Sequence, residues 1–187
     1  SLIEDGIDAL IVTADVYREK LDEQDRSTNA IFSDGSAAIL VTKREPTHEI
    51  LSASNLTDGT GADLLCQSVA GGGQASLFMN GKEVYLFTRR VVIAEMIKVA
   101  NAANLELGDV DRALVHQASK LVLDGIRRDL QEFEIDVPSN LEHYGNTVSS
   151  TIPLLLSEDI QSFMAGTLII SGFGVGLSCS TLLIQQR

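Results

Sequence analysis

The stretch ALVHQASKLVLDGIRRDL, residues 113–130, joins a short apolar run to a region of helical periodicity. The first three residues read as a buried strand, and His116 follows them directly. Apolar side chains then recur every four positions from Ala118 to Leu130, which predicts a helix with one apolar face. A strand that leads into a helix is the repeating unit of layered α/β folds, so this stretch predicts that fold class.

The same alternation continues after this unit. Residues 152–163 predict a further helix, with Pro153 in a first-turn position where proline is tolerated. Residues 167–171 and 178–184 predict two strands, which flank the Gly-rich turn Gly172-Phe-Gly-Val-Gly176. These elements extend the α/β pattern.

Two strands and one helix are predicted before the unit. Residues 9–13 and 37–41 are short apolar runs, and each reads as a strand, the first of them buried. Residues 92–103 show helical periodicity. The apolar face of that helix collects Val92, Ile93, Met96, Ile97, Ala100 and Ala103.

Two other segments lack such a pattern. Residues 49–81 are rich in Gly, Ser, Asn and Thr, with three consecutive glycines at 71–73, and they predict a long irregular segment. The first seven residues read as the last turn of an amphipathic helix closed by Gly6, which predicts that more of this helix precedes Ser1.

The composition excludes several classes of function. The chain has 14 basic and 26 acidic side chains, and its formal net charge of −12 disfavours binding to nucleic acid or to an anionic membrane surface. It contains no apolar run long enough for a spanning helix and no signal-peptide pattern near Ser1. Two cysteines are too few for a disulfide scaffold, so a reducing compartment, the cytoplasm, is expected.

Three features could carry chemistry. His116 follows a buried strand, where α/β sheets place their sites, and could act as a hydrogen-bond donor, as a general base or as a structural histidine. Asn146, in Tyr144-Gly-Asn-Thr147, could donate to an oxyanion or serve as an ordinary turn residue. The Gly-rich turn precedes a strand and not a helix, which excludes a dinucleotide loop and leaves an oxyanion hole or a plain tight turn.

Taken together, these segments carry a family resemblance. The order and spacing of His116-Gln-Ala-Ser119, Tyr144-Gly-Asn-Thr147 and Gly172-Phe-Gly-Val-Gly-Leu177 closely resemble the C-terminal signatures of the β-ketoacyl-acyl carrier protein synthase III family. Upstream, Asp25-Arg-Ser-Thr28 and Phe32-Ser-Asp-Gly-Ser-Ala37 resemble two further family segments. The resemblance covers nearly the whole chain.

The resemblance implies a thiolase-like, five-layered αβαβα fold built from two repeats. Residues 1–45 would be the end of the N-terminal repeat, and residues 46–187 the C-terminal repeat. Family members are cytoplasmic homodimers, so a homodimer or pairing with the chain's own N-terminal half is expected. Half of such a fold leaves a sheet face without its covering layer, which predicts an exposed apolar patch.

The resemblance also implies an activity in fatty acid biosynthesis. An acyl group passes from acyl-CoA to a Cys, malonyl-acyl carrier protein loses CO₂, and the two fragments join. His116 and Asn146 would stabilise the enolate, and Gly174, Val175 and Gly176 would form the oxyanion loop. The nucleophile would lie before Ser1, so residues 1–187 alone are expected to be inactive. No metal and no permanently bound cofactor are implied, since CoA and the carrier's phosphopantetheine are substrates.

Further positions follow from the same resemblance. Arg26 and Ser119 would contact CoA or phosphopantetheine, and Lys120, Arg127 and Arg128 would dock the acidic carrier protein. At two docking positions, however, leucines replace the family's basic residues.

Those leucines are Leu86 and Leu121. Because electrostatic steering needs the missing charges, two alternatives stay open. One is a non-catalytic thiolase-like subunit that supports a partner synthase. The other is an acyltransferase of secondary metabolism with a different acyl acceptor.

Overall fold

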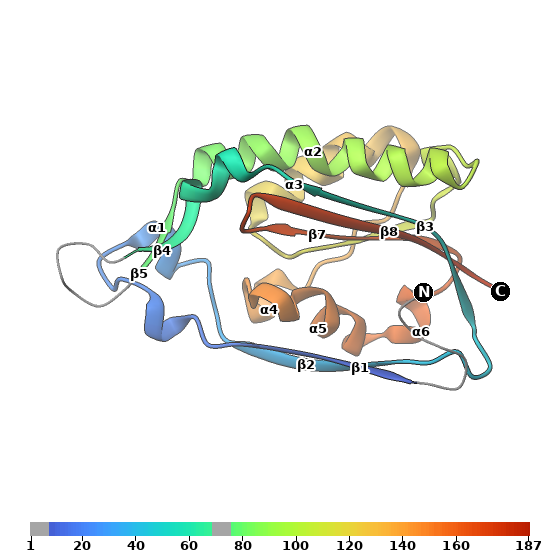
Figure 1. Cartoon of the computed structure of the whole chain (residues 1–187), viewed down its shortest axis with the longest axis horizontal. Helices are drawn as coiled ribbons and strands as arrows, with labels where there is room; N and C mark the ends of the chain where they lie inside the picture. Colours follow the sequence, from blue (N-terminus) through green and yellow to red (C-terminus); the bar gives the residue numbers. More distant parts are fainter. Residues whose placement is uncertain (1–7, 69–75) are drawn as a thin grey trace.

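The structure is a computed structural model that describes residues 8–68 and 76–187, and it is built in layers (Figure 1). The helix end expected within residues 1–7 and the three glycines at 71–73 lie outside the described residues. The short elements comprise α1 (Arg26–Asn29) and the 3₁₀ turns η1 (Arg18–Lys20), η2 (Gly59–Leu64), η3 (Leu107–Asp109), η4 (Gln131–Phe133) and η5 (Val148–Ser150).

A four-stranded mixed sheet forms the centre of the molecule. Its strand order is β3 (His48–Thr57), β8 (Ser178–Gln186), β7 (Thr167–Gly174) and β6 (Arg112–Val115). Only β6 and β7 run parallel, while β8 pairs antiparallel with both of its neighbours. Strand β6 is fully buried from Ala113 to Val115, as the apolar run predicted.

Helices cover both faces of this sheet. On one face lie α2 (Gly81–Ala102) and α3 (Lys120–Leu130), and on the other lie α4 (Leu141–Tyr144), α5 (Thr151–Glu158) and α6 (Ile160–Phe163) (Figure 1). The periodicity that predicted α3 is confirmed, because its recurring apolar side chains from Val122 to Leu130 are buried. Together with α2 they make the main core against β6 and β7.

The first strands form a further layer beyond α5. Strands β1 (Ala9–Asp15) and β2 (Gly35–Val41) pair antiparallel, and Ile39 packs against the cluster around Leu155 (Figure 1). The prediction that residues 9–13 are buried is wrong: Leu10 is 65% exposed, because α5 covers only one face of this sheet. Leu10, Val12 and Leu40 share one face of this sheet and are exposed, which fits the expectation of a sheet face without a covering layer.

The segment predicted to be irregular contains three strands. Besides β3, it holds the antiparallel pair β4 (Leu65–Ser68) and β5 (Ser76–Met79). Strand β3 lacks an apolar run because its serines bond to the helix above it: Ser52 donates to the Val99 carbonyl at 2.6 Å and Ser54 to the buried Glu95 carboxylate. The backbone of β3 pairs antiparallel with β8 along its length, and this pairing makes the segment a strand.

Two helix boundaries also differ from the prediction. Helix α2 begins at Gly81 and not near Val92, because Asn80 caps it by accepting from the Glu83 backbone N–H. Its buried stripe takes in Val99 and leaves Ile97 40% exposed. The helix predicted over residues 152–163 is two helices, since the backbone leaves helical geometry at Asp159.

Candidate active site

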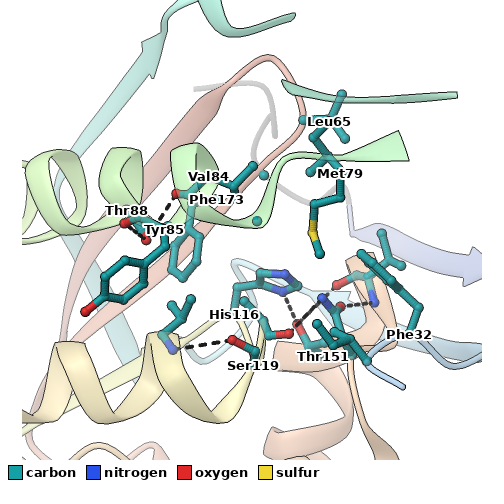
Figure 2. A pocket seen from close by; sticks show the side chains of 18 of the residues that line it. Phe32, Leu65, Met79, Val84, Tyr85, Thr88, His116, Ser119, Thr151 and Phe173 are labelled. Carbon is teal, nitrogen blue, oxygen red and sulfur yellow. Dashed lines mark hydrogen bonds between the residues drawn. The ribbon is translucent and has the colours of Figure 1, made fainter. Parts of the chain in front are cut away.

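A cavity of about 700 Å³ opens where the parallel strands β6 and β7 end, between α2, α3 and the loop before α5 (Figure 2). Its lining is mostly apolar. The loop residues that follow β6 and the last residues of β7 both reach it, as expected for the carboxyl edge of an α/β sheet. His116, Asn146, Gly174 and Val175 all line this one cavity, although they are far apart in the sequence.

His116 is held on three sides. Its backbone N–H donates to the Ser171 carbonyl at 2.9 Å, which fixes the first loop residue to β7. Its Nδ1 lies 2.7 Å from the Thr151 Oγ1, and the Phe173 ring meets the imidazole edge-on at a centroid distance of 5.3 Å (Figure 2). With Nδ1 engaged, Nε2 is the ring nitrogen left for a ligand.

Burial among these groups lowers the pKa of His116 from its ordinary 6.5 to about 4. The imidazole is therefore neutral at pH 7. A neutral ring can donate one hydrogen bond without bringing a charge into the cavity.

This pKa predicts a pH dependence of stability. Between pH 6.5 and about 4 the unfolded chain binds a proton at His116 and the folded protein does not, so stability falls as the pH falls through this window. At about 1.4 kcal/mol per pKa unit, the loss approaches about 3 kcal/mol. Urea unfolding of the complete protein at pH 7 and pH 4.5 should show that His116→Gln loses less stability than wild type. Equal losses would contradict the assignment.

Asn146 is 4% exposed and its amide is oriented by the backbone. Its Oδ1 accepts from the Val148 N–H at 2.9 Å, and one N–H of its Nδ2 donates to the Ala118 carbonyl at 3.1 Å. A side-chain amide has two N–H groups, so the second can donate into the cavity. The contact with Ala118 ties the asparagine loop to the segment that follows His116.

The Gly-rich turn joins β7 to β8. Gly174 and Val175 line the cavity. Gly176 has a φ of +142°, and a Cβ there would meet Ser178, so this glycine allows the chain to reverse direction. Gly176 is not among the described residues that line the cavity. The structure therefore brings two of the three predicted loop residues, Gly174 and Val175, to the site.

Several lining residues were missed by sequence reasoning. Thr151 and Phe173 contact His116, while an apolar wall is formed farther along by Phe32, Leu65, Met79, Val84 and Phe87 (Figure 2). Phe173 lies within the Gly-rich turn and Thr151 lies shortly after Asn146, and this closeness in sequence is a signal that could have identified them. Leu65 and Met79 of this wall were missed because residues 49–81 were expected to be irregular.

The expected CoA and pantetheine residues lie at or near the cavity. Ser119 lines it and also caps α3 by accepting from the Val122 N–H. Arg26 is exposed on α1, next to Ser27, which lines the cavity.

The expected docking residues are partly engaged within the chain. Lys120 forms an ion pair with Asp124 at 3.0 Å, and Arg127 donates twice to the Val137 carbonyl. Arg128 is exposed on the same helix. Arg127 also lies 3.9 Å from Asp124, so this one carboxylate balances part of the charge of Lys120 and Arg127.

Neither cysteine joins the site. Cys179 is 1% exposed within β8, and burial raises the pKa of its thiol. Cys66 lies in β4, and among the described residues that line the cavity neither cysteine is present. No group of three or more His, Cys, Asp or Glu side chains within residues 8–68 and 76–187 could hold a metal ion.

Comparison with known proteins identifies the family. The sequence model described as "3-Oxoacyl-[acyl-carrier-protein (ACP)] synthase III" matches residues 1–76, and that of its C-terminal region matches residues 100–186. The chain belongs to the 3-oxoacyl-acyl carrier protein synthase III family. The β-ketoacyl-acyl carrier protein synthase III of Streptococcus sanguinis strain SK36 is 31% identical over 94% of this chain.

Solved structures of this family share the fold. The synthase III of Thermus thermophilus superposes with a TM-score of 0.83 at 27% identity, over 96% of this chain and 59% of that one. The priming β-ketosynthase of the R1128 polyketide pathway gives a TM-score of 0.81 at 27% identity, over 96% and 57%. These matches confirm the thiolase-like layered fold. The chain spans 58% of the length of the Streptococcus relative.

Within the described ranges, none of the helices combines the length and the apolar character that crossing a bilayer requires.

Proposed function

We propose that the protein carrying these residues condenses an acyl-CoA primer with malonyl-acyl carrier protein, with loss of CO₂. This chain would supply the groups that stabilise the enolate. The observation that supports this proposal is that the neutral imidazole of His116 and the buried, oriented amide of Asn146 line one apolar cavity. Two neutral donors that converge on one oxygen stabilise developing negative charge most strongly where water is excluded.

In the first half-reaction, a cysteine thiolate attacks the acyl-CoA carbonyl. The tetrahedral oxyanion accepts a hydrogen bond from a backbone N–H of the Gly-rich turn, near Val175, and the thiolate of CoA then leaves. An exposed turn between two strands suits this step, because its backbone can approach the reacting atom closely.

In the second half-reaction, the malonyl thioester loses CO₂, and the electrons of the broken carbon–carbon bond pass into an enolate. His116 and Asn146 donate to the enolate oxygen. The enolate carbon then attacks the acyl group on the cysteine, and the cysteine leaves as a thiolate. Both donors keep their protons throughout.

The nucleophile is proposed to be a cysteine other than Cys66 and Cys179. The thiolate is the reactive form, and burial of Cys179 disfavours it. Its Sγ lies 3.7 Å from the hydroxyls of Ser171 and Thr181, inside the sheet. Cys66 is in β4, where its Sγ is 3.9 Å from the Asp63 carbonyl oxygen.

The lining suggests how substrates bind. The apolar wall around Met79 and Phe87 is suited to the acyl chain, and Ser119 and Arg26 are proposed to contact the pantetheine and adenine portions of CoA. We propose a cytoplasmic homodimer, whose assembly would cover apolar surface such as that on β1 and β2.

One observation favours a second candidate. Leu86 and Leu121 are 48% and 63% exposed on α2 and α3, and Lys120 and Arg127 are engaged within the chain. A weakly cationic surface is poorly suited to an acidic carrier protein. The second candidate is therefore an acyltransferase of secondary metabolism, in which the acyl group passes to a small acceptor.

The complete protein, expressed from its full reading frame, can be tested with labelled acyl-CoA and with malonyl-acyl carrier protein. Condensation predicts a labelled cysteine adduct and CO₂ release. An adduct without CO₂ release, followed by transfer to an alcohol or amine, would favour the second candidate. Absence of any adduct would rule out the condensing mechanism.

A further inference from the structure

The role of His116 depends on which ring nitrogen carries its single proton. With the proton on Nε2, the ring donates a hydrogen bond into the cavity. With the proton on Nδ1, the ring presents a lone pair there and acts as a base. Because Nδ1 contacts the Thr151 hydroxyl at 2.7 Å, the direction of this one hydrogen bond decides between the two.

The Thr151 hydroxyl has one proton and two acceptors within reach. It lies 2.7 Å from His116 Nδ1 and 3.1 Å from the Val148 carbonyl oxygen. That carbonyl already accepts the Thr151 backbone N–H, which closes the turn η5, so it does not depend on the hydroxyl. Nδ1 of His116 is therefore the nearer of the two groups to the Thr151 hydroxyl. Unlike the Val148 carbonyl, it has no backbone N–H bonded to it in this turn.

Thr151 is also held firmly in place. It is 3% exposed and is the first residue of α5. A β-branched side chain has few rotamers, which keeps Oγ1 within hydrogen-bond distance of Nδ1 (Figure 2).

We propose that Thr151 is a positioning residue that donates to Nδ1 of His116 and so keeps the proton on Nε2. This inference rests on the proposed function, in which His116 acts as a donor to the enolate oxygen. The imidazole then offers its N–H to the cavity without first changing tautomer. Thr151 touches no substrate in this scheme and acts only through His116.

The first test is ¹⁵N NMR of the histidines in the complete protein at pH 7, with His116 assigned by comparison with His116→Gln. We expect a pyridine-type Nδ1 and a pyrrole-type Nε2. In Thr151→Val, which preserves the shape but removes the hydroxyl, the two tautomers should become mixed. The opposite tautomer in wild type would overturn the inference, whether or not the protein is active.

The second test is the rate of malonyl decarboxylation. Losing one hydrogen bond that sets the tautomer should lower this rate about tenfold in Thr151→Val, while acylation by acyl-CoA stays within about twofold. Thr151→Ser should restore most of the rate. Thr181→Val, which removes another buried threonine hydroxyl away from the cavity, should retain it and controls for packing.

The outcomes separate the two hypotheses. A wild-type protein that decarboxylates no malonyl thioester refutes the proposed function, and the NMR result still decides the tautomer. Normal decarboxylation by Thr151→Val refutes the inference alone. If Thr151→Val does not fold, Thr151→Ala and the wild-type spectrum provide the same decision.

Discussion

His116→Ala is expected to lower malonyl decarboxylation by about 10²–10³-fold, the usual cost of removing one oxyanion donor. The physical reason is that a neutral N–H in an apolar cavity has no solvent competitor and needs no reorganisation as the enolate forms. Of the two proposed donors to the enolate oxygen, Asn146 alone would remain in this variant. The measurement is CO₂ release from labelled malonyl thioester by the complete protein.

The same variant should acylate at close to the wild-type rate, because the first half-reaction uses the Gly-rich turn. His143→Ala is a matched control: this histidine is exposed on α4, packs edge-on against Tyr144, and is not among the residues that line the cavity. If His116→Ala decarboxylates like wild type, the enolate role belongs elsewhere. If it loses acylation as well, His116 acts in both half-reactions.

The parts of the site that could be predicted are those set by short-range pattern. A buried run followed at once by a polar residue indicates the carboxyl edge of a sheet, and His116 and the Gly-rich turn both lie there in the structure. Asn146 reaches the same place through its bonds to Ala118 and Val148, which join neighbouring loops. Local pattern located these residues, and the family resemblance suggested their roles.

The parts that were missed depend on contacts between distant segments. Strand β3 has no apolar run, because Ser52 and Ser54 bond to residues of α2 that lie 47 and 41 positions later. Composition alone therefore suggested a loop. The same error hid the apolar wall at Leu65 and Met79, since β4 and β5 form a separate two-stranded sheet among the described residues.

Burial was the other source of error. An apolar β-branched run predicts a strand, but whether it is buried depends on which layers cover it. Strand β1 is paired as expected, yet Leu10 and Val12 are exposed, because they lie on the sheet face opposite to that of Ile39, which packs toward α5. The sequence pattern indicated that these apolar side chains favour burial. It did not indicate whether another layer of the described residues covers them.

Val175→Pro is expected to impair acylation and to spare decarboxylation, which is the reverse of the effect expected for His116→Ala. Proline lacks the backbone N–H, so acylation by labelled acyl-CoA should fall by about 10²–10³-fold if this group donates to the tetrahedral oxyanion. Val175 is 58% exposed in the turn, so its side chain contributes little to the core. Val175→Ala keeps the N–H and should acylate normally, which separates the backbone group from the side chain.

The decisive readout is decarboxylation by the same proline variant. His116 and Asn146 are oriented by Thr151, Ala118 and Val148, none of which lies in the turn. Malonyl decarboxylation should therefore survive in Val175→Pro while acylation is lost, the reverse of the His116→Ala pattern. If both half-reactions fail together, the proline has displaced the turn and its neighbour Phe173 from the imidazole. If acylation persists, the oxyanion donor is a different group, and the Gly-rich turn serves only to reverse the chain.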